Sequence, residues 1–265
     1  MKKKRGMWIL VMMLLLLGTF SVTANAASYQ KVTYEKTKIG NYYFWLQSDT
    51  LYFGKSKSSG KAKKLHYSSS AVTNGKTIYY AQRASGGVWV EKYNIKDSRI
   101  QSVAFLDDMD EICGLYGRKI FLGGTEKYSI TYNLYSYDMD TWKVKKIAGN
   151  VRGRACYGRY LVGVPQVGAV VDVPLYVYDA KKGKLKTVEK SIWSYAVKGK
   201  TVYYVKKVSG WWASGNLKVK AYKYNLTTGK KKALTKTIQC RDIPRITAKS
   251  MTYYDKNGKK RQIKF

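Results

Sequence analysis

The stretch Leu175-Tyr176-Val177-Tyr178-Asp179-Ala180-Lys181-Lys182-Gly183-Lys184-Leu185-Lys186 carries the pattern that decides the fold. Tyrosine and apolar residues alternate before Asp179, and this period of two is typical of a β-strand. Gly183 closes a tight turn of the kind that follows such a strand. Lysine then alternates with leucine, so we expect the lysines to face outward and the leucine inward. The stretch predicts a hairpin whose second strand is rich in lysine.

This hairpin recurs along the chain with a regular period, which is the signature of a repeat protein. Further copies begin at Leu134 and Ala221, and the first of these continues into Lys143-Val144-Lys145. Turn glycines, each followed by an aromatic-rich apolar run, recur at spacings of 35, 42, 41 and 41 residues. These glycines are Gly40, Gly75, Gly117, Gly158 and Gly199.

Each unit of about 40 residues therefore carries four short strands, here called a to d in chain order. Four strands in a unit of this length are typical of a blade, so we predict an all-β chain that forms a β-propeller of four-stranded blades. Five units begin near residues 31, 71, 107, 151 and 191, and residues 237–265 have room for three more strands. We expect six blades, with residues 28–34 supplying the missing outer strand and closing the ring. The alternative is five blades and an irregular tail.

The repeated motifs resemble those of a known group of proteins. Gly75-Lys76-Thr77-Ile78-Tyr79-Tyr80 and the Leu-Tyr-x-Tyr-Asp hairpins extend the pattern from Gly40 to about Val188 and on to Asn225. The pattern is similar to secreted bacterial TolB-like six-bladed propellers, and above all to tyrosine-rich repeat domains of unknown function from Gram-positive bacteria. The resemblance implies a binding platform and no more, since no site motif of the family is visible to carry over.

The chain is strongly basic. Its 265 residues hold 50 Lys and Arg against 16 Asp and Glu, and 40 of the 50 are lysines. Lysine lacks the planar fork with which arginine reads bases, so we expect no sequence-specific binding of nucleic acid. A single histidine and three scattered cysteines exclude most His/Cys metal sites, and we expect neither metal nor cofactor. The partner we expect is an anionic cell-wall polymer, a glycan or a protein.

Residues 1–26 have the composition of a cleaved signal peptide, which leaves 27–265 as a single propeller domain. Lys2-Lys3-Lys4-Arg5 form a charged start, residues 7–17 a short apolar run, and Ala24-Asn25-Ala26 a cleavage site. The apolar run is too short for a membrane-spanning helix, which needs about 20 residues. We expect an exported, monomeric protein, secreted or associated with the cell wall, whose net charge is +30 once the four basic residues are removed.

Long connections between blade strands are the natural place for a ligand, because loops on a rigid scaffold carry function. We expect the b–c and d–a connections, among them 83–88, 106–111, 150–154 and 209–217, to share one face. Adjacent indoles in the last of these could stack on sugar rings, although one of them could instead pack on a neighbouring blade. The acids of 107–111 could hold a cation such as Ca²⁺ or pair with nearby basic residues. The predicted ligand-binding residues are Trp211, Trp212, Arg152, Arg154, Asp107, Asp108, Asp110 and Glu111.

Lysine on the outermost strands has two interpretations. Charge on an exposed strand edge prevents pairing with another edge, and we expect such lysines on the d strand of every blade. The net charge nevertheless far exceeds the magnitude of about 2 to 8 that keeps a small domain soluble, which favours binding to a polyanion. The predicted polyanion-binding residues are Lys61, Lys63, Lys64, Lys143, Lys145, Lys146, Lys184, Lys186, Lys230, Lys231 and Lys232.

Signals of catalysis are weak, and we expect no catalytic residues. His66 stands at the end of an outer strand without a nucleophile motif around it. The segment 136–142 differs from the sialidase Asp box, since Asp140 replaces the glycine and Trp142 comes one residue early. The alternative to a binding platform is a glycan-cleaving enzyme of the sialidase or glycosidase propeller type, which needs two carboxylates in one cleft.

Overall fold

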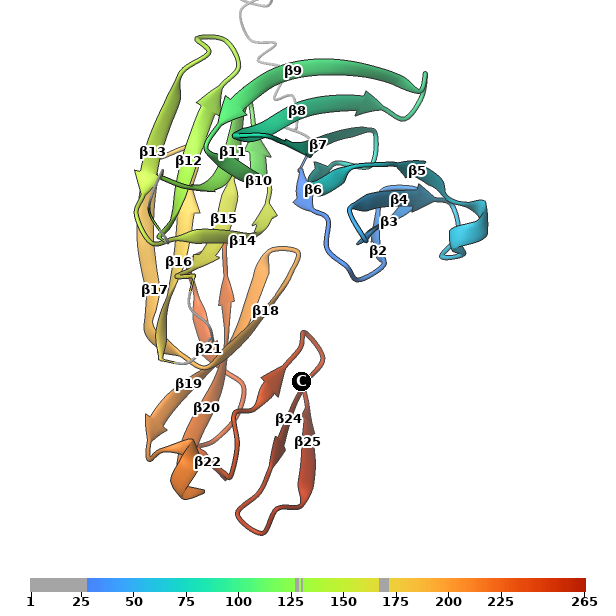
Figure 1. Ribbon diagram of the computed structural model, residues 1–265. Coiled ribbons are helices and arrows are strands. Elements are labelled where there is room, and N and C mark those ends of the chain that lie inside the picture. Colours follow the sequence, from blue (N-terminus) through green and yellow to red (C-terminus); the bar gives the residue numbers. More distant parts are fainter. Residues whose placement is uncertain (1–27, 127–128, 130, 167–171) are drawn as a thin grey trace, which may run out of the picture.

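The structure, a computed structural model, describes residues 28–126, 129, 131–166 and 172–265 (Figure 1). Regular structure in these ranges is β-strand apart from two short 3-10 helices, η1 (Ser59–Lys61) and η2 (Trp212–Ser214). The predicted signal peptide lies outside the described residues. In the part of the chain that is described, no helix is both long and apolar enough to cross a membrane.

Five four-stranded antiparallel units follow one another along the chain, and a three-stranded sheet ends it. Unit 1 is β2 (Thr37–Ile39), β3 (Tyr42–Gln47), β4 (Thr50–Gly54) and β5 (Lys63–Leu65); unit 2 is β6 (Ser68–Thr73), β7 (Thr77–Ala84), β8 (Gly87–Asn94) and β9 (Arg99–Asp107); unit 3 is β10 (Met109–Tyr116), β11 (Lys119–Thr125), β12 (Tyr132–Asp138) and β13 (Val144–Ala148). Unit 4 is β14 (Arg152–Tyr157), β15 (Tyr160–Val164), β16 (Val173–Asp179) and β17 (Lys184–Ile192); unit 5 is β18 (Ser194–Lys198), β19 (Thr201–Ser209), β20 (Leu217–Asn225) and β21 (Lys231–Ala233); the last sheet is β23 (Arg245–Ile246), β24 (Ser250–Tyr254) and β25 (Lys260–Lys264). The predicted all-β class and the four-stranded units are confirmed, whereas the number of blades stays a prediction.

Apolar side chains fill the spaces between consecutive units. One cluster joins units 1 and 2, a second joins units 2, 3 and 4, a third joins units 4 and 5, and a fourth joins unit 5 to the last sheet. Aromatic rings supply much of the first, where Phe44 and Phe53 stack with their centres 6.0 Å apart. Burying a side chain of this size stabilises the fold by about 1.5–3 kcal/mol. The core therefore lies between the sheets, as alternating strands require.

The N-terminal strand does not close the ring as we expected from the sequence. β1 (Gln30–Lys31) pairs with β14 of unit 4 and β6 of unit 2, so it lies between two a strands. Tyr29 and Val32 on either side of it explain the choice, because Tyr29 packs edge-on against Tyr79 and Val32 is buried. Figure 1 shows the last sheet, in red, apart from unit 1, in blue.

Two other details differ from the sequence prediction. The b–c connection at 83–88 is short, because β7 and β8 extend to Ala84 and from Gly87 and leave only Ser85 and Gly86 between them. Residues 237–265 were expected to add their strands to a sixth blade, but the first of these strands, β22 (Ile238–Cys240), pairs with β20 of unit 5. The tail thus first adds a strand to unit 5 and only then forms the last sheet.

The turn glycines that define the repeat are not equivalent in their surroundings. Gly75 has a φ of +84°, and a Cβ there would lie 2.7 Å from the carbonyl oxygen of Ile39 in unit 1. Gly117 has a φ of +60°, but a Cβ there would meet nothing within 4 Å. Both positions need a left-handed backbone, but only at Gly75 would an added Cβ also clash with a neighbouring unit.

Gly75→Ala is expected to lower the free energy of unfolding by about 3 kcal/mol, because it adds a backbone clash to the left-handed strain. Gly117→Ala is the matched control and should cost about 1 kcal/mol, the strain alone. Urea unfolding of the two variants measures the difference. Equal losses would show that units 1 and 2 do not meet closely at this turn.

Candidate functional site

The inserted N-terminal strand brings a lysine against a carboxylate of unit 3. Lys31 Nζ donates to Glu111 Oε2 at 2.8 Å and to the carbonyl oxygen of Gly153 at 2.9 Å. The other carboxylate oxygen, Oε1, accepts from Arg152 Nε at 2.6 Å and from the Tyr132 hydroxyl at 3.0 Å. Strands β1, β10, β12 and β14 therefore meet at one carboxylate. We call Lys31, Glu111, Tyr132 and Arg152 the Glu111 cluster.

Burial makes the charges of this cluster depend on one another. The side chains of Lys31 and Glu111 are only 11% and 12% exposed. Burial alone would raise the pKa of Glu111, but the Lys31 ammonium and the Arg152 guanidinium outweigh it and lower the pKa to about 2. Burial likewise opposes the charge on Lys31, yet its pKa is raised, with the Glu111 carboxylate among the causes. Both oxygens of Glu111 already have donors, so the cluster holds the units together rather than offering a reactive acid.

The three other acids predicted with Glu111 do not join it. Asp107 ends β9 and is exposed, and Asp108 is exposed in the one-residue turn before β10, with a φ of 57°. The prediction that residues 106–111 form a long loop is therefore wrong, because β9 and β10 take up all of them except Asp108. Asp110 is partly buried and its pKa is raised by burial, although Arg83 opposes the shift.

Asp108 and Asp110 line a cavity of about 340 Å³ between units 2 and 3. Glu126, beyond the end of β11, contributes a third carboxylate to the lining, and Arg83 a positive charge. Glu126 Oε1 lies 2.7 Å from Lys146 Nζ. We call this the Asp110 cavity; it is where the structure gathers acids that could act on a ligand.

Arg154, the second arginine predicted to bind ligand, lies two residues along β14 from Arg152. Its Nε is buried and has no hydrogen-bond partner among the described residues. Among the described residues it forms no ion pair with Glu111, so only Arg152 belongs to the Glu111 cluster.

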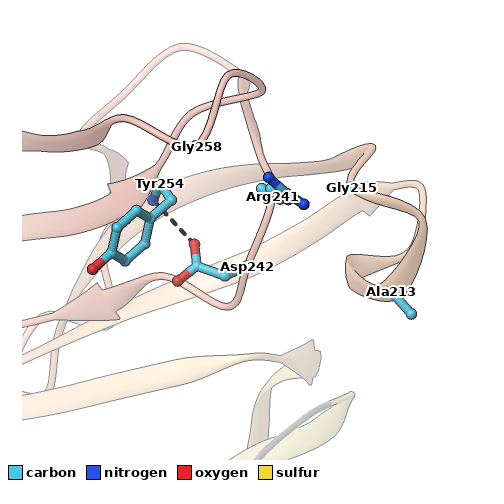
Figure 2. A pocket seen from close by; sticks show the side chains of 6 residues that line it. All are labelled: Ala213, Gly215, Arg241, Asp242, Tyr254 and Gly258. Carbon is cyan, nitrogen blue, oxygen red and sulfur yellow. Dashed lines mark hydrogen bonds between the residues drawn. The ribbon is translucent and has the colours of Figure 1, made fainter.

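The loop with the paired tryptophans borders a second cavity, about 430 Å³ in volume. Ala213 and Gly215 of that loop form one wall, and Arg241, Asp242, Tyr254 and Gly258 form the others (Figure 2). One oxygen of Asp242 accepts the backbone N–H of Tyr254 at 3.0 Å. Arg241, Asp242 and Tyr254 thus line one hollow, which we call the Arg241 cavity.

Trp211 is partly packed and partly open. Its ring meets the buried Trp193 edge-on at 5.7 Å, and Lys207 Nζ lies 5.5 Å from the centre of each ring. The indole is still 46% exposed. Trp193 accordingly belongs to the core, whereas Trp211 is only partly covered. Trp212 begins η2.

All eleven lysines predicted to bind a polyanion are exposed, and they lie on or beside the outer strands β5, β13, β17 and β21. Lys231 pairs with the buried Glu189 at 2.6 Å and Lys146 with Glu126. Two expectations were wrong. Lysine was expected on the d strand of every blade, but the outer strand of unit 2, β9, has none. The residues between the lysines were expected to face inward, but Val144 and Leu185 are 47% and 38% exposed, because neither face of a strand end at the rim is covered.

The segment that resembles a sialidase Asp box is a structural turn. Oδ1 of Asp138 accepts the backbone N–H groups of Asp140 and Thr141 at 3.0 and 3.2 Å. Its carboxylate therefore caps the turn between β12 and β13.

Sequence reasoning did not single out Lys31, Arg241 or Asp242. Lys31 had no signal of its own, since its partner is 80 residues away. Arg241 and Asp242 follow β22, whose pairing with β20 the repeat pattern did not contain.

No protein-family model and no curated protein matches the sequence. Solved structures do resemble it. The uncomplexed acylaminoacyl peptidase of Pyrococcus horikoshii is 11% identical with a TM-score of 0.53, over 92% of this chain and 47% of that one. An oligogalacturonate lyase in complex with manganese is 10% identical with a TM-score of 0.50, over 88% and 77%. TolB from Acinetobacter baumannii is 13% identical with a TM-score of 0.46, over 89% and 63%.

The fold is a β-propeller of four-stranded blades. The units described above are its blades, and the strand order within each runs from β-strand a to d as the repeat predicted. At identities of 10–11% the likeness to the peptidase and to the lyase shows the fold alone, because one fold can serve many functions.

Glu111→Gln is expected to lower the free energy of unfolding by about 3 kcal/mol at pH 7, because Lys31 and Arg152 lose their counter-charge in a buried place. Folding lowers the pKa of Glu111 from 4.5 to about 2. Its stabilising charge is therefore complete above pH 4.5 and is lost as the pH falls toward 2. The difference in free energy of unfolding between wild type and variant, measured with urea, should therefore become smaller as the pH falls from 4.5 toward 2.

Glu126→Gln is the matched control, since Glu126 also pairs with a lysine but is exposed. Exposed ion pairs contribute little to stability, so this variant should unfold like the wild type at each pH. If both variants lose the same free energy of unfolding, the Glu111 cluster stabilises the fold no more than an exposed ion pair does.

Proposed function

We propose that this propeller is an exported, non-catalytic binding platform that holds an anionic polymer at the cell surface. The observation that carries the proposal is the repetition of exposed lysines on the outer strands of units 1, 3, 4 and 5. Of the eleven, Lys146 and Lys231 have an acidic partner within 4 Å among the described residues. The charge of the other nine is available to a partner.

Repetition is what would make such a surface effective. One exposed contact between a lysine and an anion is worth about 1 kcal/mol or less in water. A polymer that spans several blades engages many lysines together, and linked weak contacts add up. Outside the cell, wall polymers and anionic glycans have this character, which agrees with the binding role that the TolB-like resemblance implies.

The other predicted ligand residues fit a second contact on the same platform. Trp211 and the Arg241 cavity lie at the b–c connection of unit 5 and offer an aromatic face, a guanidinium and a carboxylate. A glycan or peptide segment of the bound partner would lie there. This contact adds recognition of shape to binding by charge.

Binding to a teichoic-acid resin is expected at low salt, with release between roughly 0.2 and 1 M, because screening shortens the reach of each charge from about 10 Å to about 3 Å. Changing Lys143, Lys145, Lys184 and Lys186 to Gln should lower the salt needed for release. Elution from the resin measures it.

A matched control changes four exposed lysines away from the outer strands, Lys76, Lys200, Lys218 and Lys249, to Gln. Net charge falls equally in both variants, so a smaller shift in the control is expected. If both variants elute at the same lower salt concentration, binding depends on the total charge and not on the outer strands. Retention of the wild type at 1 M salt, or no binding at low salt, contradicts the proposal.

A glycan-cleaving enzyme is the second candidate, and one observation favours it. Asp108, Asp110 and Glu126 line one cavity, and burial raises the pKa of Asp110, as a general acid requires. The proposed binding role predicts no turnover of sialosides or wall glycans. Turnover that Asp110→Asn abolishes, while Asp107→Asn leaves it unchanged, would establish the enzyme instead.

A further inference from the structure

Four blades share one turn between their third and fourth strands. It starts with an Asn or Asp whose side-chain oxygen accepts backbone N–H groups within the turn, and it contains a residue with a left-handed backbone four positions later. The starting residues are Asn94, Asp138, Asp179 and Asn225. The left-handed residues are Ser98, Trp142, Gly183 and Gly229, with φ between 57° and 67°.

Trp142 is out of place in this series. Two blades use glycine and one uses serine at the position, and a left-handed backbone is unfavourable for a bulky side chain. Among the described residues, eight that are not glycine have a positive φ, and only Trp142 and Tyr67 are aromatic. The indole does not gain its place by packing, because Trp142 is 78% exposed. The residue therefore weakens the fold and presents a large flat ring to solvent.

The surroundings of this ring are positive. Lys143 and Lys145 are exposed and have no ion pair among the described residues, and Val144 between them is 47% exposed. Both acids of the turn already have basic partners, since Arg118 Nε lies 2.8 Å from Asp140 Oδ1 and Lys119 Nζ lies 3.7 Å from Asp138 Oδ2. An exposed aromatic ring and two ammonium groups without an ion pair thus lie within four consecutive residues at the rim of unit 3.

We propose that Trp142 stacks on the sugar rings of an acidic polysaccharide while Lys143 and Lys145 bind its charged groups. The inference rests on the proposed function and narrows its substrate class to anionic polymers that contain sugar rings. A flat indole gains from a flat partner, and a bare chain of phosphates offers none. The lysines alone would not distinguish the two.

The test compares two polyanions, polygalacturonate and inorganic polyphosphate, on wild type and on Trp142→Gly. The variant should bind polygalacturonate about three- to tenfold more weakly, as expected for one stacking contact, and polyphosphate equally well. It should also melt about 2–4 °C higher, because glycine relieves the left-handed strain. A lower melting temperature would contradict the strain.

Tyr67→Gly is the matched control, since Tyr67 is an aromatic at a φ of 60° and 77% exposed, but lies between β5 and β6 at the other end of the blades. It should leave both affinities unchanged. The assignment of Trp142 is overturned if both variants lose the same affinity, or if Trp142→Gly binds both polymers more weakly to the same extent. It is also overturned if, in a parallel measurement, the variant loses affinity only for anionic lipid vesicles or single-stranded DNA. A wild type that binds neither polymer contradicts the proposed function itself.

Discussion

No sheet in this protein can bury both of its faces alone, and the rest of the structure follows from that constraint. The strands are short, from two to nine residues, and the inner ones carry apolar side chains on both sides. Each sheet must therefore lie against the next, with Phe44 and Phe53 between the first two blades and Val162 and Val202 between the fourth and fifth. The outermost strand of a blade is the most exposed, and in units 1, 3, 4 and 5 it carries exposed lysines.

The parts of the fold that could be predicted from sequence are those set by neighbours in the chain. Alternation over five to nine residues predicted the strands, and the left-handed conformation of Gly117 and Gly183 explains why glycine marks the turns. Lysine on the outer strands could also be predicted, because it follows from the alternation within each hairpin. The pattern failed at the rim, where Val144 and Leu185 alternate as an inward face would but have no neighbour to cover them.

The parts that could not be predicted depend on residues far apart in sequence. Glu111 was selected for its acidic neighbours, yet its environment is set by Lys31 and Arg152, 80 and 41 residues away. The two basic partners change it from a candidate ligand residue into a buried link between blades. Asp110, adjacent in sequence, faces a cavity instead, since successive side chains of a strand point to opposite faces.

The position of β1 has a consequence for the order in which the molecule folds. Gln30 pairs with Thr73 and with Tyr157, so the second edge of this strand has no partner until more than 120 further residues have emerged. Contacts over such a separation form late, because a long loop must close first. The first strand of the chain is therefore among the last to reach its native place. Until then Lys31 and Glu111 stay hydrated, and the first two blades can pack while the centre remains open.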